Sequence, residues 1–361
     1  MQLVMPGAAD HCVAAALAAI DAGRPVVVAD DPADGITDGY LVFAAARATP
    51  ALVAFTVRHG SGFLCVALPE ANCDRLALPP MQHADPSRAA QRVTVDARGT
   101  GTGISAAARA STIATLASPD SVIGDFVRPG HVVPVAAHQG GVLARPRHCE
   151  AAVDLARLAG LAPAAGLCAI VSQEQPGAMA RGAELGRFAA EHGLVCLSVA
   201  ELVEHRRRTE PQVVRAATTS MPTVRGPFQA VGYRGVHDAA EHVALVAGTI
   251  GDGWDVPVHV HRECLSGDIL GSAMCGCRRA LDEAMQSFAS RGRGVVVYLR
   301  PPDAARTCGA PAPAAESSAA AWILTDLGVR SAQVPGPEPD RLEKWVAARP
   351  RRATAPSRIA G

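Results

Sequence analysis

The stretch RPGHVVPVAAHQGGVLARPRHCE, residues 128–150, places an apolar run between a proline–glycine turn and a glycine pair. The run at 132–135 contains three valines and predicts a buried strand, which the glycines at 140–141 end. An apolar segment of helical spacing follows at 151–161. A strand, a glycine turn and a helix in this order predict a mixed α/β domain. The imidazoles and guanidinium groups around the turn suit a small phosphorylated or carboxylated ligand, although two basic surface loops would have the same composition.

The composition allows two domains and argues against several classes of function. A chain of 361 residues is long enough for two ordinary cores, and 49% of its residues are hydrophobic. Aromatic residues make up only 4%, so the cores must be aliphatic and rich in alanine. Basic and acidic residues balance at 34 each, which argues against nucleic acid as the main partner.

The apolar segments and the cysteines point to a cytoplasmic protein. No uninterrupted apolar run reaches the length of about 18 residues that a membrane span needs, so no membrane partner is expected. The first twelve residues, MQLVMPGAADHC, lack a basic region followed by an apolar core, so no secretory signal is expected. The ten cysteines are therefore expected to be reduced thiols or metal ligands.

Helical periodicity and β-branched runs alternate along the chain. Helices are expected at Cys12–Ala22, Leu41–Ala46, Thr49–Arg58, from near Ser105, at Ala151–Leu161 and at Gly186–His192. Strands are expected at Pro25–Ala29, Phe63–Leu68, Val93–Asp96, Leu167–Val171, Leu194–Val199, Phe228–Tyr233, His242–Ala247, Pro257–His261 and Gly294–Leu299. This pattern predicts the α/β class, of the α+β type, with two mixed domains.

Changes in composition indicate where the domains begin and end. Residues 1–208 form the expected first domain, and the polar, proline-punctuated stretch 209–222 is expected to be a linker. Residues 223–335 form the second domain, within which 301–320 is rich in Pro, Ala and Ser and is expected to be poorly ordered. The basic, proline-containing tail at 336–361 is expected to be partly disordered.

Two loops have compositions typical of ligand binding. The acidic loop from Asp30 to Tyr40 follows a buried strand, which is a common place for a divalent cation, although a solvated turn explains it equally well. The GTGTG run at 99–103 precedes a predicted helix and could hold a phosphate, although such glycine clusters are weak signals by themselves.

Three cysteines have the spacing of a zinc site. Cys275 and Cys277 are separated by one residue, and Cys264 lies eleven positions before Cys275. Three thiolates and one open position for water form the catalytic arrangement of Zn²⁺, in which the metal lowers the pKa of the bound water. Three buried thiols would be the alternative, but Gly267 and Asp268 beside them favour a loop and hence a metal.

The order of these motifs resembles a known pair of enzyme families. Residues 8–206 resemble 3,4-dihydroxy-2-butanone 4-phosphate synthase, and residues 222–300 resemble GTP cyclohydrolase II, in the order of the bifunctional protein of riboflavin biosynthesis. The first match runs through GRPVVVADD, LVFAA, RHGSG, LPPM, TGISAA, RPGHVVPV, GGVLAR, HCEAAVDLARLAGL and FAAEHGL. The second runs through GYR, EHVALV, HVHRECLSGD, CGC and GRGVVVYLR.

For the first domain, the resemblance implies conversion of ribulose 5-phosphate to 3,4-dihydroxy-2-butanone 4-phosphate and formate, a lyase reaction. It implies Mg²⁺ or Mn²⁺ bound by His148, and an essential histidine at His131. Arg145 and Thr102 match phosphate-contacting positions, together with His148 in the substrate pocket. Cys149 replaces a phosphate-contacting threonine, which weakens that contact.

Several acidic positions of the synthase family are changed in this chain. The metal-binding glutamate corresponds to Ile36, and the last aspartate of the same loop corresponds to Tyr40. Asp38 keeps a carboxylate in this loop and is the candidate catalytic acid or base. A late catalytic glutamate corresponds to Ala169, and another aspartate corresponds to Ala108. Because a hard cation needs oxygen ligands and each proton-transfer group contributes about 10²–10⁴ in rate, these changes predict weakened chemistry.

The second domain is expected to be a truncated GTP cyclohydrolase II. Its cysteines are retained, but the family's Gly-His-Glu-Gly-Arg-Gly segment is replaced by the residues from Pro301 to Cys308, and most of the downstream part is missing. A zinc-bound water without residues that hold the substrate has nothing to attack. We therefore expect no ring opening of GTP.

The expected function is a divergent riboflavin-biosynthesis protein with a retuned or weakened synthase and an inactive second domain. The resemblance implies a homodimer that shares its sites between subunits. Two alternatives fit the same residues: a non-catalytic scaffold or regulatory paralogue, or an enzyme of specialised metabolism that acts on another sugar-phosphate-like substrate.

Overall fold

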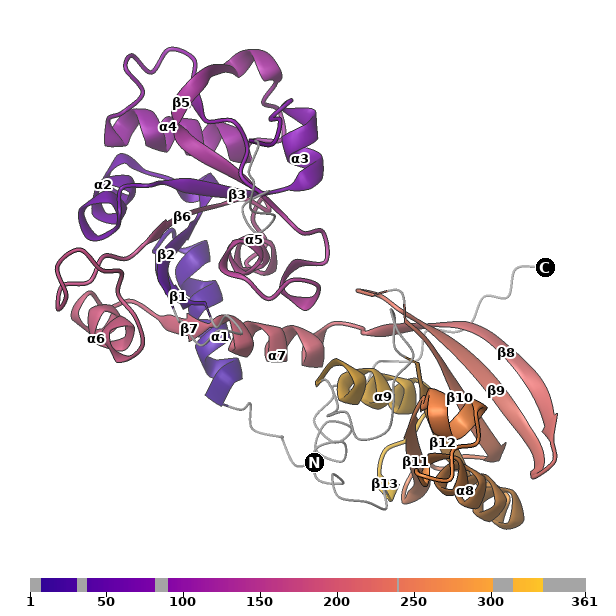
Figure 1. The fold of residues 1–361 in the computed structure, drawn as a ribbon. Coiled ribbons are helices and arrows are strands. Elements are labelled where there is room, and N and C mark those ends of the chain that lie inside the picture. The colour runs from indigo at the N-terminus through magenta and orange to yellow at the C-terminus, as the bar shows by residue number, and fades with distance from the viewer. Residues whose placement is uncertain (1–7, 31–37, 82–89, 239, 301–313, 334–361) are drawn as a thin grey trace. The chain divides into compact units, whose positions relative to one another are not determined.

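The computed structural model describes residues 8–30, 38–81, 90–238, 240–300 and 314–333 (Figure 1). It divides into two compact units, Met1–Arg206 and Arg207–Gly361, and the boundary falls within helix α7 (Val199–Thr209). Ile36, the stretch 301–313 and the tail from 334 onward lie outside the described residues. Among the helices that are described, none combines the length and the hydropathy that a membrane crossing requires.

The first unit is built on a mixed sheet of order β4-β5-β3-β6-β2-β1-β7. Its strands are β1 (Val26–Ala29), β2 (Gly39–Ala44), β3 (Cys65–Pro69), β4 (Val95–Ala97), β5 (Phe126–Ala137), β6 (Ala165–Ala169) and β7 (Cys196–Ser198). Its helices are α1 (Ala8–Asp21), α2 (Pro50–His59), α3 (Glu70–Arg75), α4 (Ala106–Ala117), α5 (His148–Leu158), α6 (Ala183–Glu191) and α7. The sheet joins β1 to β7 and β3 to β5 in parallel and its other neighbours antiparallel.

Helices cover both faces of this sheet. One face packs against α1 and α5, where Ala16 and Leu155 are fully buried beside the valines of β1 and β5 (Figure 1). The other face packs against α2 and α4 through Val53 and Ile113. Small and aliphatic side chains fill both interfaces, as the low aromatic content predicts. The strands carry apolar side chains on both faces because both faces are covered.

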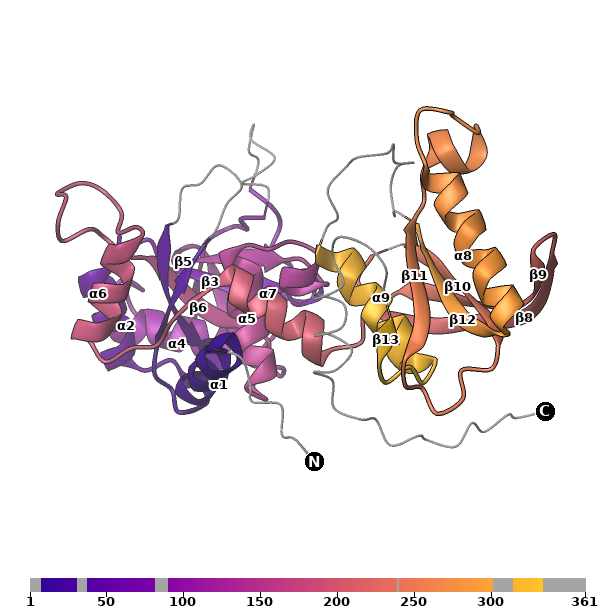
Figure 2. The same ribbon diagram turned by 90° about the horizontal axis from the view of Figure 1, so that it is seen from below.

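The second unit has a six-stranded sheet of order β13-β11-β12-β10-β9-β8. Its elements are β8 (Val213–Thr223), β9 (Gly226–Gly235), β10 (Glu241–Gly248), β11 (Val256–Arg262), α8 (Cys277–Arg291), β12 (Arg293–Leu299), α9 (Ala314–Asp326) and β13 (Ala332–Gln333). Helix α9 packs on one face through Ile323 and Leu324, and α8 packs on the other through Met285 and Phe288 (Figure 2). The expected fold class, two mixed α/β domains, is therefore confirmed.

The structure corrects three expectations about local structure. Residues 41–46 were expected to be helical, but β2 occupies Gly39–Ala44, because Leu41, Val42 and Phe43 pair with β1 and β6 inside the sheet. The expected linker 209–222 contains the edge strand β8, whose polar residues are exposed and whose backbone pairs with β9. The stretch expected to be poorly ordered up to residue 320 is helical from Ala314, where alanines pack against the sheet.

Candidate functional site

The candidate pocket of the first unit forms where β1 ends and α5 begins. Strand β1 ends at Ala29, which pairs with Gly39 of β2, and Tyr40 pairs with Val28, two residues before Asp30. The Asp30 N–H donates to the Asp38 carbonyl oxygen over 2.9 Å. Helix α5 begins at His148, and its first turn is directed at the same end of the sheet. The described ends of the acidic loop, Asp30 and Tyr40, therefore lie beside His148 at the start of α5.

His148 is held by two neighbours from these strands. Its Nδ1 lies 2.6 Å from Oδ2 of Asp30, and Asp30 is only 4% exposed. The ring of Tyr40 stacks on the imidazole, with 3.9 Å between the ring centroids and an interplanar angle of 13°. Burial opposes protonation of His148, but the neighbouring Cys149 and the hydrogen bond to Asp30 outweigh burial and raise its pKa above the usual value. A cationic His148 is suited to an anion.

A cavity of about 600 Å³ lies beside this histidine. It combines basic groups, thiols and apolar side chains, and no described residue in its lining is acidic. The lining consists of Tyr40, Ser61, Phe63, Cys65, Ala90, Gln91, Val135, Arg145, Arg147, His148, Cys149, Leu167, Cys168 and Ala169. The structure therefore brings together Arg145, His148 and Cys149 of the predicted site.

Buried carboxylates orient the two arginines of the cavity. Nη2 of Arg145 lies 2.8 Å from Oε1 of Glu150, whose side chain is fully buried, and the same oxygen accepts from the His138 N–H. Nη1 of Arg147 lies 4.0 Å from Oδ2 of Asp30. Both guanidinium groups remain nearly half exposed, so they can contact a ligand while their direction is fixed.

Few carboxylate oxygens of the described residues are available to a hard divalent cation near this cavity. Asp38, the candidate catalytic residue, is outside the cavity lining, and its Oδ1 lies 2.5 Å from Nε of Arg181. Asp30 uses Oδ2 for His148, and its Oδ1 is buried without a partner among the described atoms. Because Mg²⁺ keeps several waters and is typically held by one or two carboxylates, Asp30 is the described residue placed to contact such an ion.

His131 is anchored away from this cavity by a buried aspartate. Its backbone N–H donates to Oδ1 of Asp96 over 2.9 Å, and its Nδ1 lies 2.7 Å from Oδ2. Gly103 lies directly on Asp96, where a Cβ atom would meet Oδ2 at 2.0 Å. This contact places the exposed Thr102 beside the His131–Asp96 pair. Neither His131 nor Thr102 lines the cavity of its own chain.

Asp96 is a functional residue that sequence reasoning missed. The motif VDA of β4 puts a charged residue at the centre of a fully buried three-residue strand. Its partner His131 is 35 positions away, so no spacing rule connects them. The signal that could have revealed Asp96 is an acidic residue in the middle of a predicted buried strand, because a buried acidic side chain requires a hydrogen-bond or ionic partner.

In the second unit, the three predicted zinc ligands lie together. The sulfur atoms of Cys264, Cys275 and Cys277 all lie within 4.8 Å of one another, and 3.9 Å separates the first two. Tetrahedral Zn²⁺ with Zn–S bonds of about 2.3 Å requires sulfur atoms about 3.8 Å apart, so the cluster fits this ion. Hydrogen bonds from Ser266 and from the Gly267 N–H lower the pKa of Cys264, which favours the thiolate.

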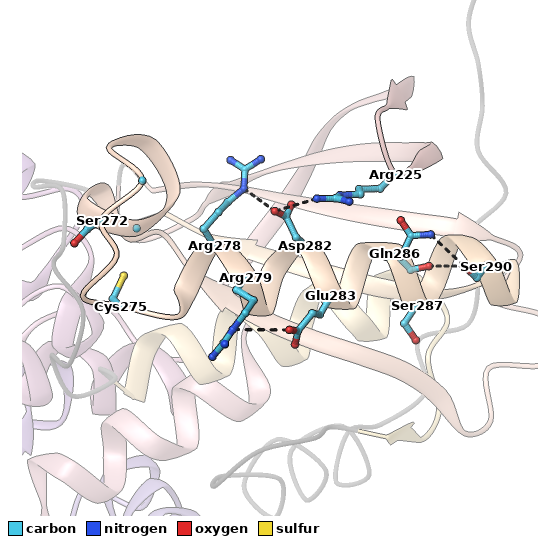
Figure 3. A pocket seen from close by; sticks show the side chains of 12 residues that line it. Arg225, Ser272, Cys275, Arg278, Arg279, Asp282, Glu283, Gln286, Ser287 and Ser290 are labelled. Atoms are coloured by element: carbon cyan, nitrogen blue, oxygen red, sulfur yellow. Dashed lines mark hydrogen bonds and ion pairs between the residues drawn. The ribbon is translucent and has the colours of Figure 1, made fainter.

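A groove of about 720 Å³ runs from this cluster along α8. Figure 3 shows that Arg225 and Arg278 both reach Asp282, over 3.3 and 3.2 Å, while Arg279 lies beside Glu283. The charges along the groove are thus paired with one another. The expected replacement segment, 301–308, lies outside the described part of the chain.

Fold and sites define a two-domain metabolic protein, with a cationic pocket for a small anion followed by a unit with a thiol cluster. The chain matches 3,4-dihydroxy-2-butanone 4-phosphate synthase over residues 14–205 and GTP cyclohydrolase II over residues 214–309. It belongs to this bifunctional family of riboflavin biosynthesis, and its first unit is synthase-like.

The similar proteins include curated relatives and solved structures. The riboflavin biosynthesis protein RibBA of Salinispora arenicola is 52% identical, covering 88% of this chain and 81% of the relative. The RibBA protein of Nocardia farcinica is 49% identical, covering 88% and 83%. RibBX of A. baumannii, a two-domain 3,4-dihydroxy-2-butanone 4-phosphate synthase, has a TM-score of 0.74 at 32% identity and covers 93% of this chain and 96% of its own. A synthase in complex with two magnesium ions has a TM-score of 0.51 at 40% identity, covering 54% and 96%.

Proposed function

We propose that the first unit binds a sugar phosphate of the ribulose 5-phosphate type and converts it slowly, as a weakened synthase, and that the second unit does not open GTP. The observation that carries this proposal is the cavity beside His148, which has two oriented arginines and a cationic imidazole but no acidic residue in its described lining. Such a pocket favours a dianionic phosphate. It offers little to a metal that would hold the sugar oxygens.

Each predicted site residue has a role in this proposal. Arg145, His148 and the thiol of Cys149 contact the phosphate end of the ligand. His131 moves the proton in enolisation, and Asp96 fixes its orientation. Asp38 could contribute only after it separates from Arg181, which makes it a poor substitute for the family's acidic residues.

The domain boundaries are proposed as 1–208 for the synthase-like domain and 223–335 for the zinc domain, and β8, which pairs with β9, extends the second domain into the stretch expected to be a linker. A homodimer is part of the proposal, because His131 and Thr102 lie outside the cavity of their own chain. A partner subunit would place these residues at a shared site. In the second domain, Zn²⁺ at the three cysteines would supply a Lewis acid and an acidic water.

Incubation of the full-length chain with ribulose 5-phosphate and Mg²⁺ should release formate, more slowly than the Salinispora arenicola relative assayed in parallel. Incubation with GTP should release none, because residues 301–308 replace the Gly-His-Glu-Gly-Arg-Gly segment that the resemblance implies at this place. Formate is measured with a coupled dehydrogenase. Release from GTP at the relative's rate would overturn the proposal for the second unit. If ribulose 5-phosphate causes neither turnover nor a rise in melting temperature, the chain is a non-catalytic paralogue.

Substitution His131→Ala should reduce formate release by about 10² or more, because the imidazole is the proposed proton-transfer group. His138 provides a matched control at the end of the same strand, since it is exposed and its Nδ1 accepts from the Gly140 N–H. His138→Ala should therefore leave the rate nearly unchanged. Equal losses in both variants would assign the proton transfer to another group.

A further inference from the structure

Asp268 lies at the base of the loop that carries the cysteine cluster, where it joins three parts of the second unit. Its Oδ2 lies 2.9 Å from Nε2 of His261 on β11 and accepts from the hydroxyl of Tyr298 on β12 over 2.9 Å. The same oxygen accepts from the backbone N–H of Cys264 over 2.9 Å. The side chain of Asp268 is only 5% exposed. Three donors from two strands and the loop therefore meet on one buried oxygen.

These three hydrogen bonds hold the start of the loop in place. They come from a backbone N–H, an imidazole and a hydroxyl, and all of them end on the same oxygen of Asp268. Breaking one of them would leave a buried polar group without its partner, which costs free energy. The backbone of Cys264 is thus fixed more firmly than an ordinary loop residue.

The rest of the loop has few apolar contacts that could hold it. Ile269 is 65% exposed, Leu270 is 72% exposed and Met274 is 95% exposed. Gly267 packs closely over the thiols, where a Cβ atom would meet Sγ of Cys275 at 2.5 Å. The loop therefore folds over the sulfur atoms with its apolar side chains at 269, 270 and 274 exposed, while Leu265 is half-buried. Its described anchors at this end are the hydrogen bonds of Asp268 and of its neighbours within the loop.

We propose that Asp268 is a positioning residue for the metal site: by holding the Cys264 backbone against β11 and β12, it sets the three sulfur atoms at the spacing of a tetrahedral ion. This inference rests on the zinc assignment in the proposed function. Asp268 touches no metal in this scheme and acts through Cys264. Outer partners of this kind typically contribute 10–100-fold to metal affinity. The separation of 3.9 Å between the sulfur atoms of Cys264 and Cys275 is the spacing that this tie sets.

The test compares metal binding by full-length variants. The zinc content of the purified wild-type chain is measured first, and Co²⁺ is then exchanged in to record its thiolate and d–d absorption bands. Competition with a chelator gives the affinity. Asp268→Asn should bind the metal about 10–100-fold more weakly and change the d–d bands. Tyr298→Phe removes one donor and should show a smaller loss in the same direction.

Asp326 provides a matched control, because it forms a similar pair in the same unit away from the cysteines. Its Oδ2 accepts from the Tyr233 hydroxyl over 2.7 Å and from Nη2 of Arg215 over 2.7 Å. Asp326→Asn should leave the metal affinity and the Co²⁺ spectrum unchanged. Tryptophan fluorescence and circular dichroism verify that each variant is folded.

The outcomes separate the inference from the assignment on which it rests. A wild-type chain that holds less than about half an equivalent of zinc, no more than Cys275→Ser, would refute the zinc site itself. A wild-type chain that holds zinc, with Asp268→Asn and Tyr298→Phe equal to it in affinity and spectrum, would refute the positioning role alone. Equal losses in Asp268→Asn and Asp326→Asn would also refute that role, because they would indicate a general effect of stability.

Discussion

Substitution Asp154→Ala should destabilise the first unit by about 3–5 kcal/mol, the usual cost of leaving one partner of a buried ion pair alone. Oδ2 of Asp154 lies 2.6 Å from Nη1 of Arg206, and both side chains are at most 5% exposed. The same oxygen accepts from the Val142 N–H over 2.8 Å. The variant removes the carboxylate that faces the buried guanidinium, which keeps its hydrogen bond to the Gly140 carbonyl oxygen, and it removes the acceptor of the buried Val142 N–H. The pair joins α5 to α7 and to the turn that precedes Arg145, so the cavity should lose ligand affinity as well.

The two units can be followed separately in a urea titration. All three tryptophans, at 254, 322 and 345, lie in the second unit, whereas both units contribute to far-ultraviolet circular dichroism. Asp154→Ala should move the transition of the first unit and leave the fluorescence transition in place. Glu174→Ala is the control, because its pair with Arg187 is more than half exposed and should contribute at most about 1 kcal/mol. A similar small shift for Asp154→Ala would mean that Arg206 finds another partner or water.

Most elements of this fold could be predicted because each is marked by its own residues. The PVVVA run gives β1, and Thr49 followed by Pro50 gives the start of α2, where the Thr49 hydroxyl accepts from the Leu52 N–H. Strand β2 was assigned wrongly because LVFAA suits either a helix or a strand. Only its pairing with β1 and β6 decides between them, and that pairing is not local.

The site was predictable where family motifs are continuous and was missed where partners are distant. His148 and the three clustered cysteines lie in short recognisable motifs. The partner of His148 was harder to find, because Asp30 lies 118 positions earlier and was noticed only as part of an acidic loop. Asp96 was not noticed at all. The stacking of Tyr40 on His148 was equally hard to predict, because the resemblance implied only that Tyr40 stands in place of an acidic residue.

On the proposed weakened synthase, carboxylates at positions 36 and 40 should raise formate release from ribulose 5-phosphate. The double substitution Ile36→Glu and Tyr40→Asp places them where the resemblance implies the family's acidic residues. The ring of Tyr40 stacks on His148 in the present chain. An aspartate at position 40 would uncover this face of the imidazole and would add a carboxylate oxygen near Asp30 as a metal ligand. Since proton-transfer groups contribute about 10²–10⁴ in rate, the expected gain lies in this range and should depend on Mg²⁺.

Tyr40→Phe is the matched control for this gain, because it keeps an aromatic ring against His148 and adds no carboxylate. It should leave the rate near that of the wild-type chain. Formate release is measured at several Mg²⁺ concentrations. A gain caused by metal binding should grow with the Mg²⁺ concentration, whereas a gain caused by tighter ligand binding should not. If the restored variant and Tyr40→Phe respond alike, the lost carboxylates do not limit the rate. In that case the cause would have to lie in the positions of Ala169 and Ala108, or in a substrate other than ribulose 5-phosphate.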